Sequence, residues 1–133
     1  MGAVPALRVL TRLAATLAAT FPGHADTPDP PPDFNGLYRP ADSAPEDWAC
    51  DHVGLQGGAW AVRGGQMIQV GRWCELDQPT PVTDMDAMLY DAVCFDDDGR
   101  TVRRLLLTRR KDGALWLVWS GGIELWLPCV PPA

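Results

Sequence analysis

The sequence predicts a small all-β protein, in which an antiparallel meander is curled into a barrel or barrel-like sheet and stapled by two disulfides. Two observations support this prediction. Glycine-containing turns separate short runs of apolar or alternating residues, as in consecutive β-hairpins. Four cysteines follow an N-terminal stretch that resembles an export signal, and an even number of cysteines in a short exported chain indicates a disulfide framework.

Residues 1–25 have the organisation of a secretory signal peptide. Arg8 and Arg12 supply positive charge before an apolar run that is shorter than the roughly 20 residues needed to span a bilayer. Gly23 and Ala25 provide the small residues of a signal-peptidase site. We therefore expect cleavage after Ala25 and a periplasmic or secreted mature chain with no stable membrane insertion.

The remaining chain is strongly acidic. Removal of residues 1–25 takes away two arginines and no acidic residue, so the formal net charge changes from −6 to −8. This balance disfavours nucleic acids and anionic membrane surfaces as partners and leaves a basic protein as a possible one. The acidity has an alternative explanation, because it also keeps a small exported protein soluble.

Composition divides the rest into a linker and one domain. Residues 26–45 are rich in proline and are expected to form an extended linker, in which the aromatic residues of segment 34–38 could dock a short first strand on the later sheet. Residues 46–133 form the predicted β domain. A core of fewer than 90 residues is marginal by itself, which explains the need for disulfides.

The strands are predicted from the turns that bound them. The turns are Gly64-Gly65, Asp97-Asp98-Gly99, Lys111-Asp112-Gly113 and Ser120-Gly121-Gly122. They bound apolar or alternating runs at 59–62, 67–70, 88–95, 101–110, 114–119 and 123–127. Paired glycines supply the positive φ angles of a tight hairpin, and the last four runs predict four consecutive antiparallel strands.

Alternation along these strands predicts which side chains face the core. In the last strand, Trp126 is expected to point away from the core, because the other side is uniformly apolar. That side consists of Ile123, Leu125, Leu127 and Cys129. In the strand before Asp97, the predicted core side consists of Met88, Tyr90, Ala92 and Cys94.

Disulfide pairing connects the cysteines to the shape of the sheet. We favour Cys50–Cys74 with Cys94–Cys129, because the first pair would staple the first hairpin region. Bridged Cα atoms lie within about 7 Å, whereas the first and fourth strands of a flat meander are about 14 Å apart. This pairing therefore predicts closure into a barrel. The main alternative, Cys50–Cys129 with Cys74–Cys94, would tie the ends of the domain together.

The sequence offers little for catalysis or metal binding, so we expect no enzyme, cofactor or metal. His52 is the only histidine after residue 25, and only Ser43 and Ser120 could serve as hydroxyl nucleophiles. The cysteines lack the Cys-x-x-Cys spacing of zinc sites. The acidic run at 96–98 lacks the spaced ligands of a calcium loop and is expected to be a polar hairpin turn.

Two features suggest a partner surface. Six of the nine basic residues after residue 25 lie between Arg100 and Lys111, and six tryptophans exceed what so small an interior needs. The candidate surface consists of Trp116, Trp119, Trp126, Arg103 and Arg109. Two alternatives remain open: the charges protect strand ends from edge pairing, and Trp48 with the N-terminal segment covers the tryptophans.

The motifs resemble a known group of proteins. Phe-x-Gly-x-Tyr at 34–38, Trp-x-Cys at 48–50 and the late Cys129 are similar to small exported bacterial disulfide-containing β proteins, a group that carries no activity over. The fold resembles, more loosely, periplasmic inhibitors of lysozyme. This likeness and the acidic charge imply a non-enzymatic binding or inhibitor-like protein that acts on a basic envelope or extracellular protein such as lysozyme. The alternative is an envelope-associated interaction protein that uses an exposed tryptophan patch.

Overall fold

A computed structural model describes residues 2–3, 18–20, 23, 31–43 and 48–129 of the chain. The expected signal peptide therefore lies largely outside the described residues. In the described ranges, no helix is long and apolar enough to cross a membrane.

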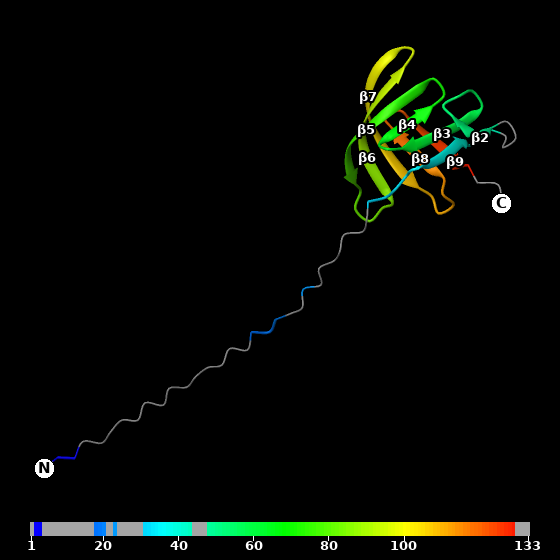
Figure 1. Ribbon diagram of the computed structural model, residues 1–133. Coiled ribbons are helices and arrows are strands. Elements are labelled where there is room, and N and C mark those ends of the chain that lie inside the picture. The colour runs from blue at the N-terminus through cyan, green and yellow to red at the C-terminus, as the bar shows by residue number, and fades with distance from the viewer. Residues whose placement is uncertain (1, 4–17, 21–22, 24–30, 44–47, 130–133) are drawn as a thin grey trace.

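The protein is a closed eight-stranded antiparallel β-barrel with one additional short strand. Figure 1 shows the strands wrapped around one axis, with the β6–β7 hairpin extending beyond the others. The strands are β1 (Gly36–Pro40), β2 (Ala49–Val53), β3 (Gly58–Arg63), β4 (Gln66–Gln69), β5 (Arg72–Pro81), β6 (Ala87–Asp96), β7 (Gly99–Arg109), β8 (Leu115–Trp119) and β9 (Gly122–Pro128). Strands β3 to β9 pair in chain order, which confirms the predicted meander.

The predicted turns connect these strands. Gly64 and Gly65 join β3 to β4, and both have positive φ angles, of 56° and 73°. The acidic run forms the β6–β7 turn, where the backbone N–H of Asp98 donates to Oδ1 of Asp96 at 2.9 Å. The expected polar hairpin is thus confirmed at this position. The sequence patterns do not predict β2 or β5.

Strand β1 closes the barrel. It pairs antiparallel with β9 on one side, where Tyr38 lies opposite Pro128, and with β3 on the other, where Tyr38 lies opposite Trp60. The short first strand expected in segment 34–38 is therefore present, and it belongs to the barrel wall. Closure satisfies the backbone groups of both edge strands, which an open sheet would leave exposed.

The favoured disulfide pairing is wrong, and the alternative is correct. Cys74 and Cys94 lie directly opposite each other on β5 and β6 and are bonded, and Cys50 is bonded to Cys129. All four cysteines are therefore used. The predicted closure is correct, although it results from the two pairings of β1 and not from a bridge between β6 and the C-terminal end.

The barrel interior is apolar and well filled. Its fully buried side chains come from facing strands, and the largest are Trp126, Met67, Leu105, Leu107, Leu115 and Leu117. The predicted core side of β6 is confirmed for Met88, Ala92 and Cys94, which are buried. The predicted core side of β9 is wrong, because Trp126 is fully buried whereas Ile123 is 63% exposed.

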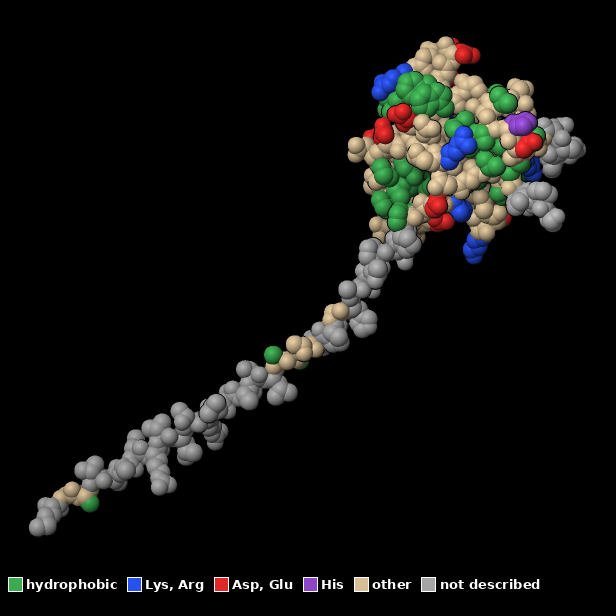
Figure 2. Space-filling view, viewed as in Figure 1, with side chains coloured by type: hydrophobic (Ala, Val, Ile, Leu, Met, Phe, Trp, Pro, Cys, Tyr) green, Lys and Arg blue, Asp and Glu red, His purple; other side chains and the backbone are tan. Residues whose placement is uncertain are grey.

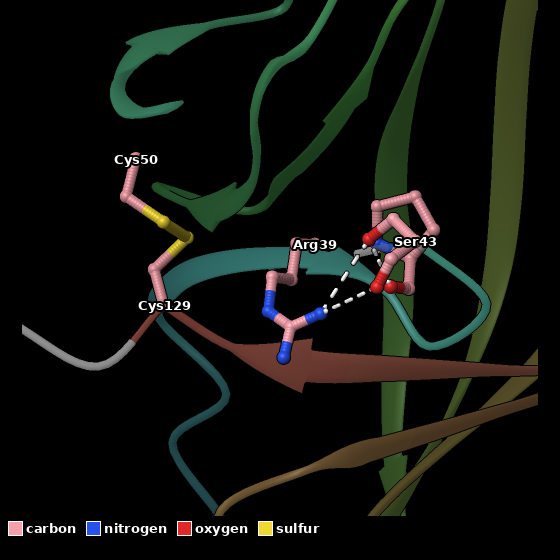
Figure 3. The surroundings of a disulfide bond; sticks show 5 residues. Arg39, Ser43, Cys50 and Cys129 are labelled. Carbon is pink, nitrogen blue, oxygen red and sulfur yellow. Dashed lines mark hydrogen bonds between the residues drawn. A yellow bond between two sulfur atoms is a disulfide. The ribbon is translucent and has the colours of Figure 1, made fainter. Parts of the chain in front are cut away.

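Strand β2 pairs parallel with the start of β3, at Gly58 and Ala59, just before the residues of β3 that pair with β1. Gly58 allows the approach, because a Cβ atom at this position would overlap the carbonyl oxygen of His52. The Cys50–Cys129 disulfide then joins β2 to the residue that follows β9, as Figure 3 shows near the start of β1, where the backbone N–H of Cys129 donates to the carbonyl oxygen of Leu37. The first and last parts of the domain are thus covalently connected.

Residues just before β1 cover the interior at one end of the barrel. Phe34 is 3% exposed, and its carbonyl oxygen accepts a 2.7 Å hydrogen bond from the hydroxyl of Tyr38. The guanidinium of Arg109 lies 5.6 Å from the centroid of the Phe34 ring and donates to the carbonyl oxygen of Asp33. Arg109 therefore serves to hold this cover in place.

The hydroxyl groups of the two tyrosines of the chain are expected to lose their protons at a higher pH than an exposed tyrosine does. Burial raises the pKa of Tyr38 above its usual value of 10.0, although the nearby Arg109 opposes this shift. Burial and the negative charge of Asp33 raise the pKa of Tyr90. We expect tyrosinate absorbance of the native protein to rise at higher pH than that of the denatured chain.

The same shifts determine how stability changes with pH. Because the folded protein disfavours the phenolate, the unfolded chain loses these protons first, so the stability is fully present below about pH 10 and decreases above it. Tyr38→Phe should reduce this alkaline loss. Native and denatured titration curves that coincide would contradict the prediction.

Candidate functional site

A hollow of about 380 Å³ opens where β1 ends, between β1, β3 and β9. It combines aromatic and acidic side chains. The lining residues are Pro40, Ala41, Asp42, Trp60, Glu124, Leu125 and Trp126. We call this hollow the acidic pocket.

The aromatic part of the acidic pocket consists of the indoles of Trp60 and Trp126, which pack at an angle to each other. Trp126 is fully buried, and its ring centroid lies 4.9 Å from that of Trp60. Trp60 is half-buried and contacts Trp48 edge to face at 5.7 Å. Among the described residues, the buried Nε1 of Trp60 has no hydrogen-bond partner. These packed rings give the pocket a rigid apolar side.

Glu124 supplies the central charge. The Nε1–H group of Trp126 donates a 3.1 Å hydrogen bond to Oε2 of Glu124, which fixes the carboxylate. The side chain is half-buried, and within the part of the chain that the structure describes no lysine, arginine or histidine nitrogen lies within 4.0 Å of it. A half-buried carboxylate without a counter-ion is costly, so this position is suited to receive a cation.

The rim of the acidic pocket is the turn that follows β1, which hydrogen bonds hold in place. In Figure 3 the guanidinium of Arg39 points into the turn that follows β1 and donates to the carbonyl oxygen of Ser43 at 3.0 Å. The hydroxyl of Ser43 in turn donates to the carbonyl oxygen of Pro40 at 2.6 Å. The backbone N–H of Ala41 also donates to the carbonyl oxygen of Leu125 at 3.2 Å. These bonds place the exposed Asp42 at the mouth.

The arrangement is suited to bind a cationic group. A positive charge is attracted to tryptophan faces and to carboxylates, and here both types line one hollow. The described residues contain no cluster of three or more histidine, cysteine, aspartate or glutamate side chains that could hold a metal ion. An organic cation, such as the side chain of arginine or lysine, is the ligand class that fits best.

The structure distributes the five residues of the predicted partner surface over different places. Arg103 and Trp119 come together, with the guanidinium carbon 5.9 Å from the ring centroid. Trp126 lies beneath the acidic pocket, and Trp116 lies on the outside of β8 with 36% of its surface exposed. Arg109 contacts Phe34 at the covered end of the barrel.

The pocket residues other than Trp126 were not among the sequence-based candidates, although weak signals exist. Glu124 and Trp126 are two positions apart, so alternation already places them on one side of β9. An acidic residue on the interior side of a barrel strand is unusual and could have attracted attention. Asp42 and Trp60 give no such signal, because their approach depends on the pairing of β1 with β3.

The face of the molecule that Figure 2 presents has mixed charge. Figure 2 shows acidic and basic side chains interspersed with separate hydrophobic groups on the face that it presents. Among the described residues, two arginines form surface ion pairs, Arg104–Asp91 at 3.0 Å and Arg110–Asp112 at 2.9 Å. His52 is exposed on β2. This face therefore shows no large patch of a single charge sign.

No protein-family model, curated protein or solved structure matches this chain.

Proposed function

We propose that this barrel is a non-enzymatic binding protein that receives a cationic side chain of a basic protein in the acidic pocket. The observation that carries the proposal is Glu124, a half-buried carboxylate that is oriented by Trp126 and has no cationic partner among the described residues. The net charge of −6 would attract a basic partner over a longer range.

The compartment agrees with such a role. Two disulfides suggest an oxidising environment outside the cytoplasm. We propose that the protein acts in a periplasm or after secretion, on a basic envelope or extracellular protein. Lysozyme is the concrete test partner, because it is basic and acts on the envelope; inhibition of it would follow if the captured side chain lies near its active site.

Binding should depend on Glu124 and on salt. We expect Glu124→Gln to weaken binding of lysozyme and of capped arginine, N-acetyl-arginine amide, at least about tenfold, because a desolvated charge pair is lost. Raising the salt concentration should weaken binding to the native protein, because it screens charge attraction. Isothermal titration at low and high salt measures both effects.

Glu75→Gln is the matched control, because Glu75 is exposed on the outer face of β5 and its loss changes the net charge equally. Equal weakening by both variants would show that only net charge matters and would contradict the pocket. Absence of binding by lysozyme, capped arginine and capped lysine would also overturn the proposal.

The alternative function is the docking of a partner protein on an exposed aromatic surface, which the same titration would detect. Trp73, which is 40% exposed, stacks on Phe95 with ring centroids 4.3 Å apart on the outer face of β5 and β6. Lysozyme binding that persists at high salt and in Glu124→Gln would indicate this aromatic surface in place of the acidic pocket.

A further inference from the structure

Two arginines converge on one tryptophan, and none of these three residues lines the acidic pocket. Arg72 begins β5, Arg103 lies on β7, and Trp119 ends β8. Their guanidinium carbons lie 5.3 Å and 5.9 Å from the centroid of the Trp119 ring. We call these three residues the arginine site.

Strand register explains this convergence. Trp119 is paired with Leu105, the last residue of β7 that β8 reaches in this direction. Arg103 precedes Leu105 by two positions on β7, so its side chain lies on the same inward side as that of Leu105. It lies past the point where β8 ends, so no residue of β8 is paired with it. Arg72 shares the inward side of Cys74 in the same way. Both guanidinium groups therefore emerge where the packed interior ends.

Arg72 is preorganised. Its Nε and Nη2 atoms donate to Oε1 of Gln69 at 3.0 Å and 2.8 Å, and the side chain is half-buried. This neutral partner fixes the plane of the guanidinium without neutralising its charge. The Nη1 atom has no protein acceptor among the described side-chain hydrogen bonds, so it remains able to donate to a ligand.

The charge of the arginine site is not compensated. Across residues 31–43 and 48–129, no carboxylate oxygen lies within 4.0 Å of a nitrogen of Arg72 or Arg103. In contrast, the neighbouring Arg104 pairs with Asp91 at 3.0 Å. Two like charges on one ring repel each other, and they remain unpaired although the chain as a whole has an excess of carboxylates, with a net charge of −6. The missing counter-charge therefore points to an anionic ligand.

We propose that the arginine site binds an oxyanion, either a carboxylate or a phosphate. Guanidinium groups donate in a planar fork that matches the oxygen atoms of both anions. Trp119 supports both cations through its ring face. The site uses other residues and the opposite charge from the acidic pocket, so it does not depend on the proposed function.

Titration by NMR tests the site on the whole protein. Phosphate and acetate are added separately at constant ionic strength, balanced with sodium chloride, while the indole N–H of Trp119 and the Nε–H groups of arginine are followed. We expect saturable shifts at Trp119 and Arg72 with at least one of the two anions. Saturation with phosphate alone or with acetate alone identifies the class of ligand.

Arg103→Gln should weaken this binding at least about tenfold, since it removes charge-assisted hydrogen bonds. Arg103→Lys, which keeps the charge and loses the fork, should give an intermediate affinity. Arg104→Gln is the matched control, because Arg104 is adjacent, carries the same charge and faces outward. Arg103 is exposed, so these variants should remain folded.

Three results would overturn the proposal: no saturation with either anion, equal shifts with chloride alone, or the same affinity in the Arg103→Gln and Arg104→Gln variants. The Glu124→Gln variant separates this test from that of the proposed function. It should keep its affinity for the oxyanion while it loses affinity for the cationic probes.

Discussion

Replacing Trp126 by alanine is expected to lower the free energy of unfolding by about 3 to 5 kcal/mol. Trp126 is fully buried, and its ring packs against Tyr38 and Trp60, with centroids 6.0 Å and 4.9 Å away. Its removal would leave a cavity where β1, β3 and β9 meet and would take the hydrogen-bond donor from Glu124. Urea unfolding followed by far-UV circular dichroism measures the loss.

Trp116→Ala is the matched control for this prediction. Trp116 is on the adjacent strand, paired with Leu125, but its side chain is 36% exposed on the outer face. Its replacement should cost less than about 1 kcal/mol, because the neighbouring surface can relax into solvent. Equal losses for Trp116→Ala and Trp126→Ala would contradict the interior position of Trp126.

Loss of the Cys50–Cys129 disulfide should have a similarly large effect. The two residues are 79 positions apart, and the loop-entropy relation gives about 4.5 kcal/mol for a loop of this length. The double variant Cys50→Ser/Cys129→Ser should therefore be far less stable towards urea than the native protein. Part of the effect arises in the unfolded chain, which loses its covalent restraint.

The second disulfide provides the comparison. Cys74 and Cys94 are 20 positions apart, which gives about 3 kcal/mol from the same relation. A non-reducing peptide map should first show Cys50 linked to Cys129. A map that links Cys50 to Cys74, or a Cys50→Ser/Cys129→Ser variant as stable as the native protein, would contradict the prediction.

The glycine turns made most of the strand order predictable. The positive φ angles that Gly64 and Gly65 adopt are allowed to few other residues, so such pairs mark hairpins independently of distant contacts. Strand β5 was less visible, because it contains Pro79 and Pro81 and many polar residues. Its pairing with β6 shifts register between Asp77 and Thr80, close to these prolines.

Failure to recognise β5 also explains the wrong disulfides. Once Arg72–Pro81 is treated as a strand antiparallel to β6, the register places Cys74 opposite Cys94, and Cys50 can pair only with Cys129. Without β5, the position of Cys74 shortly after the run at 67–70 assigns it to the first hairpin. The pairing therefore depends on a long-range register that turn signals do not specify.

Alternation correctly sorted the residues of β9 into two faces, but it did not show which of the two faces the barrel interior. Ile123, Leu125 and Leu127 are more apolar as a set than Glu124 and Trp126, so hydrophobicity favoured the wrong face. The large volume of Trp126 is better suited to fill the centre of a barrel, and Glu124 is tolerated because it lies near the open end. The acidic pocket was missed for this reason and because the approach of Asp42 and Trp60 depends on the pairing of β1 with β3.

The position of β1 also sets an order of events during biosynthesis. This strand is made before all others, but its partner β9 emerges last, so the ring can close only after nearly the whole domain has been synthesised. Until then β1, which can already pair with β3, and the most recently made strand each have an unpaired edge, which is a liability for aggregation. Cys50 must likewise wait for Cys129 while Cys74 is already available, so oxidation that begins too early would trap the bridge between Cys50 and Cys74.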